Sequence, residues 1–342
     1  MLDRAVGALG GLALGDALGM PTQNFPRSVI RERFGVVDDF HPGPDDNEIS
    51  RGLPAGRVTD DTDQAVILGR SFVAGGGRVE PRAFADALLA WEERMRAEGS
   101  LDLLGPSTRR ALALVAEGVS PDETGRWGDT NGAAMRIAPI GVGVPLAGIV
   151  DAVEQASRVT HHTGVAIAGA AAIAAAVSSG VEGRPLAESL AHAIDAARLG
   201  AERGSYVPGA DVATRIEWAL HLVGASAPPA AAERARPDEA LDLVYRLVGT
   251  GLATQEAVPA ALALASLYPG DVWEACRHAA SLGGDCDTIA AMTGAVVGAH
   301  VGWVSVPAGV RARLTAANPG LALDGLAEQL ISVRSGAASR PR

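Results

Sequence analysis

The sequence predicts a predominantly helical protein, and three observations support this. Hydrophobic residues make up 48% of the 342-residue chain, whereas aromatic residues make up only 4%, so small side chains such as alanine must fill much of the core. Alanine has the highest helix propensity of all residues. Segments with the length and composition of helices recur along the chain, and the alternating pattern of strands is almost absent.

Ten segments are predicted to be helices from their length and apolar periodicity. They cover residues 83–98, 107–117, 147–158, 165–177, 186–199, 212–223, 239–248, 256–267, 271–282 and 288–300. Turn signals separate several of them, at Gly75-Gly76-Gly77, Ser120-Pro121-Asp122, Ser226-Ala227-Pro228-Pro229 and Pro269-Gly270. Two long uncharged stretches, 164–181 and 289–306, are rich in Ala, Gly and Ser, and we expect buried helices there rather than membrane spans.

Two segments depart from the helical pattern. Residues 36–58 contain several prolines, glycines and acidic residues, so they are predicted to form a long loop. Such a loop is either a lid over a binding site or a plain surface excursion, and both interpretations remain open. The tail from Arg334 onward is predicted to be disordered. The expected organisation is therefore one domain over residues 1–333 and a tail over 334–342.

Composition excludes several classes of function. The formal net charge is −11, which argues against binding to a nucleic-acid backbone. The chain contains no lysine, which excludes Schiff-base catalysis and the P-loop lysine. Its two cysteines are too few for a disulfide framework and no signal-peptide layout is evident, so we expect a cytoplasmic protein. No membrane partner is expected, and a monomer is expected because no coiled-coil seam is visible.

Two short motifs near opposite ends of the chain combine carboxylates with threonine hydroxyls. They are Thr59-Asp60-Asp61-Thr62 and Gly283-Gly284-Asp285-Cys286-Asp287-Thr288, and a helix is expected directly after each. Either motif alone can be explained as a helix cap, but a cap needs only one carboxylate and adjacent aspartates repel each other. Oxygen ligands suit hard divalent cations. If the fold brings the motifs face to face, they predict a site for Mg²⁺ or Mn²⁺.

Two further motifs lie between the acidic ones. The segment Gly128-Asp129-Thr130-Asn131-Gly132-Ala133-Ala134-Met135-Arg136 is predicted to form a turn and a short helix, whose backbone N–H groups can hold a phosphate or a carboxylate. Arg136 either assists an anion or forms a structural ion pair. In Thr160-His161-His162-Thr163 the adjacent histidines point apart, so metal ligation is not expected. One histidine contacts a substrate, or the segment simply caps the next helix.

The order of these motifs resembles the ADP-ribosylglycohydrolase family, which includes the dinitrogenase reductase-activating glycohydrolase. The resemblance covers residues 3 to 330, and the two acidic motifs are its most diagnostic part. The matching segments are Gly10-x4-Gly15-Asp16-Ala17-Leu18-Gly19, Thr59-Asp60-Asp61-Thr62, Asn131-Gly132-Ala133-Ala134-Met135-Arg136, Thr160-His161 and Gly283-Gly284-Asp285-Cys286-Asp287-Thr288-Ile289-Ala290.

The resemblance implies an all-α fold, a single orthogonal multi-helix bundle, with a centre of two divalent cations, Mg²⁺ or Mn²⁺. The implied metal ligands are Thr59, Asp60, Asp61, Asp285, Asp287 and Thr288. Asp287 would bridge the two ions. Asp60 or Asp61 would also be catalytic, accepting a proton from a metal-bound water while the N-glycosidic bond at a ribose C1 is cleaved. The implied substrate contacts are Gln23, Asp129, Asn131, Gly132, Ala133 and His161.

One position departs from the family pattern. Many members carry a glutamate shortly after the Gly-Asp-Ala-Leu-Gly segment, and Gln23 stands in that place here. Glutamine forms hydrogen bonds but cannot take up a proton. The base is then another carboxylate, the preferred substrate differs, or activity is lost. Together with the following Phe25-Pro26-Arg27-Ser28, this form looks like a separate bacterial branch of the family.

The leading hypothesis is a metal-dependent hydrolase of an ADP-ribosylated substrate. A second hypothesis keeps the N-glycosidase chemistry but assigns a smaller ribosyl substrate, a nucleoside or nucleotide, because a shared fold does not fix the substrate. A third is a module that binds ADP-ribose without turnover. A phosphohydrolase built on the same aspartates is the weakest alternative, because the order of the other motifs favours the family.

Overall fold

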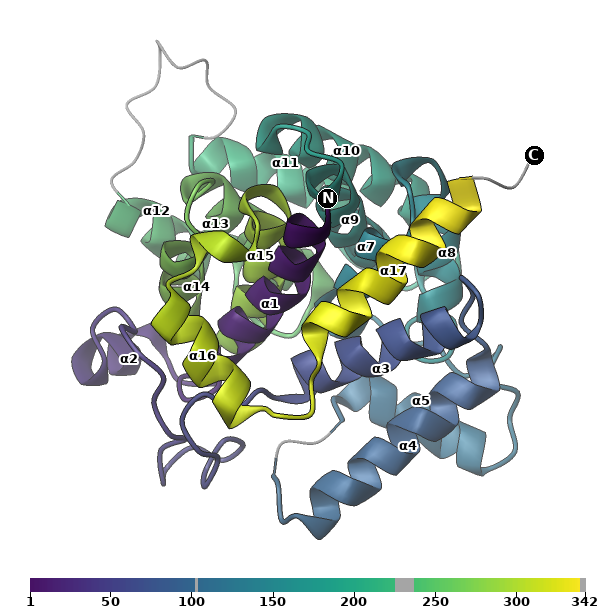
Figure 1. The fold of residues 1–342 in the computed structure, drawn as a ribbon, viewed down its shortest axis with the longest axis horizontal. Coiled ribbons are helices and arrows are strands. Elements are labelled where there is room, and N and C mark those ends of the chain that lie inside the picture. The colour runs from purple at the N-terminus through teal and green to yellow at the C-terminus, as the bar shows by residue number, and fades with distance from the viewer. Residues whose placement is uncertain (102–103, 225–236, 339–342) are drawn as a thin grey trace.

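The computed structural model describes residues 1–101, 104–224 and 237–338, and helices account for most of them (Figure 1). No strand occurs in these ranges; extended pairing there is limited to two isolated bridges, Thr130 with Ala253 and Thr163 with Ser205. The predicted all-α fold is therefore confirmed. The turn predicted at Ser226–Pro229 and residues 339–342 of the predicted tail lie outside the described residues.

The helices follow one another along almost the whole chain. The first group is α1 (Leu2–Gly19), α2 (Arg27–Arg33), α3 (Asp60–Ala74), α4 (Pro81–Ala97) and α5 (Pro106–Ala116). The central group is α6 (Gly132–Met135), α7 (Ala138–Gly143), α8 (Ile149–Ser157), α9 (Gly164–Val181) and α10 (Leu186–Ala201). The last group is α11 (Val212–Leu222), α12 (Pro237–Leu243), α13 (Thr254–Leu267), α14 (Val272–Ala280), α15 (Cys286–Val301), α16 (Ala308–Ala317) and α17 (Leu323–Ala338). Each of the ten predicted segments overlaps a helix of this series, whereas α1, α2, α7, α16 and α17 were not predicted.

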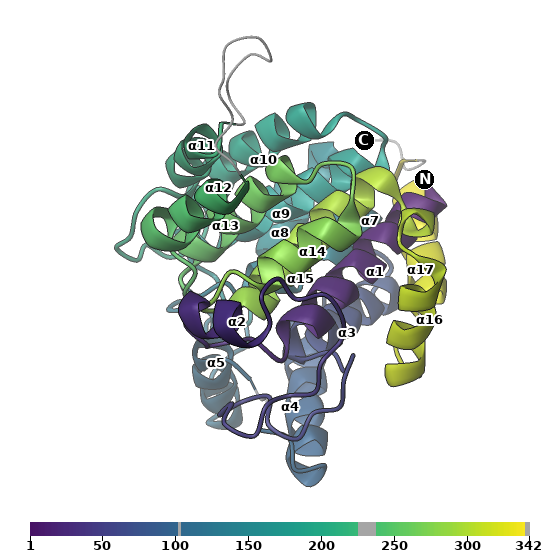
Figure 2. The same ribbon diagram turned by 90° about the vertical axis from the view of Figure 1, so that its left-hand side faces the viewer.

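Helix α9 lies in the middle of the bundle. Its sequence is almost entirely Ala, Gly, Ile, Val and Ser, and every residue from Ala166 to Val181 is buried. α7, α8, α10 and α15 pack against it, and its small side chains allow these backbones to come close (Figure 2). Within the described ranges, α9 is the one helix long and apolar enough to cross a membrane, and 89% of it is covered by the rest of the fold. The prediction of a buried helix here is confirmed.

Helices α1 and α15 come from opposite ends of the chain and pack side by side (Figures 1 and 2). Glycines recur at every fourth position of α1, at Gly7, Gly11, Gly15 and Gly19. A Cβ atom at Gly11 would lie 2.1 Å from the carbonyl oxygen of Gly294, and one at Gly19 would lie 2.3 Å from the Cα of Asp287. Only glycine permits this approach. It brings the C-terminal end of α1 next to the first turn of α15.

The long loop over residues 36–58 is held against the helices at three places. The N–H of Val37 donates to Ser281 Oγ (2.9 Å). Near the middle, the buried Asn47 donates from Nδ2 to the backbone oxygen of Gln23 (2.8 Å). At its end, the side chain of Asn318 binds the carbonyl oxygen of Gly56 (2.7 Å) and the N–H of Val58 (3.1 Å). The loop therefore covers the turn that follows α1 and does not extend away from the domain.

The prediction of a disordered tail from Arg334 was wrong for residues 334–338, which form the last turns of α17. The Arg334 side chain is only 4% exposed. Its guanidinium donates to the carbonyl oxygens of Gly141, Val142 and Val144, at 2.8 to 3.1 Å, and Nη2 lies 2.5 Å from Glu182 Oε1. These carbonyls end α7, where a helix has no partners of its own for them. The tail is thus anchored by a charged hydrogen-bond donor.

Replacing Arg334 by methionine is expected to lower the free energy of unfolding by about 2–4 kcal/mol, because it strips the end of α7 of its donors and leaves Glu182 without its cation. Urea denaturation followed by circular dichroism measures this. Arg82→Met is the control, since Arg82 forms an exposed ion pair with Asp86 and should change stability by less than about 1 kcal/mol. Equal effects of the two substitutions would contradict the anchoring role.

Candidate functional site

The fold brings the two acidic motifs together. The first motif forms the N-terminus of α3 and the second forms the N-terminus of α15. Thr288 donates from Oγ1 to Asp61 Oδ2 (3.2 Å), so the two motifs are in direct contact although they are 227 positions apart. Thr59 Oγ1 lies 3.2 Å from the same carboxylate oxygen. Asp61, Asp285 and Asp287 are buried, whereas Asp60 is partly exposed.

A third carboxylate, that of Asp16, holds the first motif in place. It lies at the C-terminal end of α1, fully buried, and accepts the N–H (3.0 Å) and hydroxyl (2.7 Å) of Thr59. It also accepts the N–H (3.1 Å) and hydroxyl of Thr62. Asp16 thereby binds N–H groups that α3 cannot satisfy itself. The sequence showed Asp16 only as part of the Gly15-Asp16-Ala17-Leu18-Gly19 motif and gave no sign of its partners.

The carboxylates crowd one another in a region shielded from water. Burial raises the pKa of Asp61 well above its usual range, and the charges of Asp287, Asp60, Asp16 and Asp285 raise it further. Burial likewise raises the pKa of Asp16 to about 6 and that of Asp285 to about 6, against hydrogen bonds that lower them. Among the described residues, Asp61 Oδ1 is buried without a hydrogen-bond donor. An arrangement of this kind favours a positive charge or a proton between the carboxylates.

The turn around Asn131 meets the second acidic motif. Asn131 donates from Nδ2 to Asp285 Oδ2, and its N–H donates to the carbonyl oxygen of Leu252 (2.9 Å). The N–H of Asp285 donates to the carbonyl oxygen of Thr250 (2.7 Å), so both partners rest on the same 250–252 turn. Gly132 and Ala133 are buried behind Asn131. Asp129 is exposed, and its backbone oxygen accepts the hydroxyl of Thr254 (2.7 Å).

His161 lies behind this turn and has no exposed surface. Its Nδ1 is 2.8 Å from Thr160 Oγ1 and its Nε2 is 3.0 Å from Thr130 Oγ1. A Cβ atom at Gly132 would lie 2.8 Å from the imidazole Cε1, so glycine is needed there. Burial lowers the pKa of His161 well below its usual range, which keeps the ring neutral. The ring lies behind the Asn131 turn, next to two threonine hydroxyls, and its contact with a substrate stays a prediction.

Gln23 is placed beside the second motif by backbone pairing. The N–H of Asn24 donates to the carbonyl oxygen of Gly284 (2.7 Å), and the N–H of Gly284 donates to that of Phe25 (3.0 Å). Gly284 has φ = +73°, a conformation that favours glycine. The Gln23 side chain is 5% exposed, and its Nε2 has no hydrogen-bond acceptor among the described residues. A buried amide of this kind is available to a ligand.

The site and the fold have known counterparts. A model of the ADP-ribosylglycohydrolase family matches residues 1–340. The chain belongs to this family. Its members hydrolyse ADP-ribosyl linkages, so the chain is a glycosyl hydrolase. The resemblance deduced from the order of the motifs is thereby confirmed.

Individual relatives of this ADP-ribosylglycohydrolase agree with the family match. The chain is 35% identical to the Uncharacterized protein YegU of Escherichia coli (strain K12) over 92% of this chain and 93% of that protein. It is 32% identical to ADP-ribosylarginine hydrolase Tri1 of Pseudomonas putida (strain GB-1) over 58% of this chain and 52% of that protein. A solved ADP-ribosylglycohydrolase-related protein complex is similar with a TM-score of 0.68 and 25% identity, over 97% of this chain and 98% of that chain.

The oxygen atoms that the two motifs offer as ligands suit a hard divalent cation. Carboxylates and threonine hydroxyls are oxygen ligands of the kind that Mg²⁺ and Mn²⁺ prefer, and Asp61 Oδ1 is a buried acceptor still to be satisfied. In residues 1–101, 104–224 and 237–338, however, no three His, Cys, Asp or Glu side chains already surround one point in a ligating arrangement. The oxygen ligands suit such an ion, but the carboxylate side chains would have to change their orientation to bind it.

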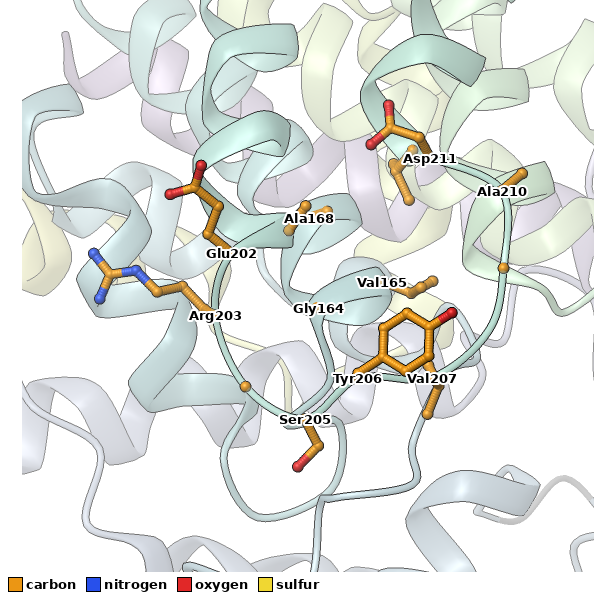
Figure 3. Close-up of a pocket in the computed structure, with 14 residues that line it drawn as sticks. Gly164, Val165, Ala168, Glu202, Arg203, Ser205, Tyr206, Val207, Ala210 and Asp211 are labelled. Atoms are coloured by element: carbon orange, nitrogen blue, oxygen red, sulfur yellow. The ribbon is translucent and has the colours of Figure 1, made fainter.

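A separate pocket of about 370 Å³ lies outside this centre (Figure 3). The loop from Glu202 to Asp211 and the first turn of α9 line it, and the highly exposed Tyr206 lies along that loop. None of the predicted metal ligands or substrate contacts lines this pocket.

Proposed function

We propose that the chain is a metal-dependent hydrolase that cleaves the N-glycosidic bond of an ADP-ribosylated substrate with a water activated by two divalent cations. The observation that carries this proposal is the contact between the two acidic motifs around the buried Asp61. Five buried or partly buried aspartates from α1, α3 and α15 gather there, which the folding of the chain alone does not require. The names of relatives such as ADP-ribosylarginine hydrolase support the substrate class.

The residues divide into those that hold the ions and those that hold the motifs. The proposed ligands are Thr59, Asp60 and Asp61 from α3 and Asp285, Asp287 and Thr288 from α15. When bound, the ions would orient the ribose hydroxyls and acidify a water. Asp16 keeps Thr59 and Thr62 in place through its four hydrogen bonds.

The protein's own groups contribute to bond cleavage in two ways. Asp61 is the proposed acceptor for the proton of the attacking water, because its buried Oδ1 has no hydrogen-bond donor among the described residues. The partly exposed Asp60 can serve in the same role from the same helix turn. The other carboxylates of the cluster would balance the charge of the ions while an oxocarbenium-like charge develops at the ribose C1. No glutamate is needed at position 23 for either contribution.

Substrate contacts are proposed at the two segments next to the acidic motifs. The buried Nε2 of Gln23 can donate to a substrate hydroxyl or phosphate oxygen beside Gly284. The turn of Asp129, Asn131, Gly132 and Ala133 offers backbone groups on the other side of Asp285, and His161 keeps that turn in shape. The loop over residues 36–58 covers Gln23 through Asn47.

The experiment incubates the purified protein with ADP-ribosyl-arginine or with a nucleoside panel, each with Mn²⁺, with Mg²⁺ or with a chelator. The proposal expects release of free ADP-ribose that depends on the cation. Release of a base from nucleosides alone would favour the smaller ribosyl substrate. ADP-ribose binding without turnover of any substrate would favour a binding module, and turnover that persists in chelator would refute the metal centre.

The stabilisation that Mn²⁺ gives the protein is expected to grow as pH rises from 5 to 8. The folded-state pKa values of Asp285, about 6, and of Asp61, higher than usual, lie above the ordinary value near 3.8. The metal-free fold therefore keeps these protons at pH 5 and loses their stabilising effect as pH rises through about 6. The cation needs ionised ligands and competes with those protons. Melting temperatures with and without Mn²⁺ at each pH measure the difference, and a constant difference would contradict the assignment.

A further inference from the structure

One short helix contacts both acidic motifs through the side chains at its two ends. Asn131 precedes α6 and Arg136 follows it. Asn131 donates directly to Asp285 in the second motif. Arg136 Nη1 donates to Gln64 Oε1 (2.7 Å), and Gln64 Nε2 donates to Asp60 Oδ2 in the first motif (2.7 Å). The segment 131–136 thus reaches one carboxylate of each motif, directly on one side and through a single amide on the other.

The orientation of the Gln64 amide follows from its partner. A guanidinium has only donors, so the Gln64 atom that faces Arg136 must be the carbonyl oxygen. The amide nitrogen is then directed at Asp60, whose Oδ2 accepts the hydrogen bond. Gln64 is fully buried and Arg136 is 1% exposed, so water does not compete for these bonds. These hydrogen bonds fix the position of the Asp60 carboxylate.

The Arg136 guanidinium contacts several side chains besides Gln64. Its Nη2 donates to Thr160 Oγ1, and its guanidinium carbon lies 5.3 Å from the centre of the Phe84 ring. It forms no direct salt bridge within the described part of the chain; its nearest link to a carboxylate is the one through Gln64. A buried cation is costly unless it is hydrogen-bonded, which makes a role beyond packing reasonable.

We propose that Gln64 and Arg136 are positioning residues that hold Asp60 in the orientation in which it binds a divalent cation. α6 then sets the geometry on both sides of the metal centre, with Asn131 holding Asp285. This inference rests on the proposed metal dependence. Removing a group that hydrogen-bonds to a metal ligand typically weakens metal affinity or activity by about 10- to 100-fold.

The test measures Mn²⁺ affinity by isothermal titration calorimetry of folded, metal-free proteins. Gln64→Met keeps the length of the side chain and removes both hydrogen bonds, so the Kd for Mn²⁺ is expected to rise by about 10- to 100-fold. Gln155→Met is the matched control, because Gln155 accepts a hydrogen bond from the N–H of Val79 away from the centre, and its Kd should stay within about twofold of the parent's. A Gln64→Met protein with the parent's Kd would overturn the inference.

A double-mutant cycle separates positioning from general damage to the fold. If Arg136 acts through Gln64, the pair Gln64→Met and Arg136→Met should raise the Kd no further than Gln64→Met alone. Independent, multiplying effects would overturn the inference. Should Arg136→Met fail to fold, Arg136→Lys keeps the charge but lacks the forked donors, and about a 10-fold weaker affinity is expected. If the parent protein bound no Mn²⁺, the proposed function would be overturned together with this inference. If the parent bound Mn²⁺ and the variants bound it equally well, only the positioning role would be overturned.

Discussion

Asp61→Asn is expected to make the metal-free protein more stable while abolishing most of its activity. The substitution removes one negative charge from a buried position that four other aspartates surround, and it keeps the size of the side chain. The melting temperature without metal should rise by about 2 °C or more. The increase in melting temperature that Mn²⁺ produces should largely disappear, and hydrolysis should fall by about 10²- to 10⁴-fold, because the proposed ligand and proton acceptor is lost. Thermal melts and product assays measure these effects.

Asp63→Asn is the matched control, on the same helix two residues further along. The Asp63 carboxylate accepts hydrogen bonds from Arg57 (3.3 Å) and from the indole of Trp91 (3.0 Å), so it lies among donors and not among acids. The same substitution should therefore lower the melting temperature of the metal-free protein. If both variants changed stability in the same direction, the crowding of carboxylates around Asp61 would not be the cause of its effect.

Gly11→Ala is expected to destabilise the protein by about 3 kcal/mol or more, a large effect for a single methyl group. The added Cβ would lie 2.1 Å from the carbonyl oxygen of Gly294, and the backbone of α15 cannot yield without moving the helix. Because α1 carries Asp16 and the first turn of α15 carries Asp287, activity should fall together with stability. Urea denaturation and Mn²⁺ titration of the surviving folded fraction measure the two consequences.

Gly325→Ala is the control for this substitution. Gly325 lies within α17, and a Cβ atom there would have no atom within 4 Å. Alanine favours helix over glycine, so this variant should be more stable than the parent by about 0.5–1 kcal/mol. If Gly11→Ala destabilised the protein and Gly325→Ala stabilised it, the contact between α1 and α15, and not helix propensity, would determine the effect at Gly11.

The meeting of the acidic motifs could be anticipated from the sequence because both repeat the same combination of aspartate and threonine before an apolar helix. The role of Asp16 could not be predicted. Its partners, Thr59 and Thr62, lie 43 and 46 positions away, and no local pattern connects them. The Asn131 turn was recognised, but only the fold shows that the Asn131 side chain faces Asp285 and so is engaged with the protein itself.

The sequence-based predictions missed the structure at both ends of the chain for the same physical reason. The chain from Arg334 resembles a disordered tail because its residues are small or polar, but Arg334 finds its acceptors on α7, nearly 200 positions earlier. No helix was predicted over Leu2–Gly19, where Gly7, Gly11, Gly15 and Gly19 face α15 in the fold. These contacts join positions about 270 to 290 apart in the sequence, which no local pattern shows.

The contact between α1 and α15 also determines when the catalytic centre can exist. α1 is synthesised long before α15, because about 270 residues lie between Gly19 and Cys286. At about 5–20 residues per second, the ribosome takes tens of seconds to supply the second partner. Throughout that time the glycine face of α1 lacks α15, its partner in the fold, and Asp61 has neither Thr288 nor Asp287 beside it. The two acidic motifs can therefore meet only after α15 has been made.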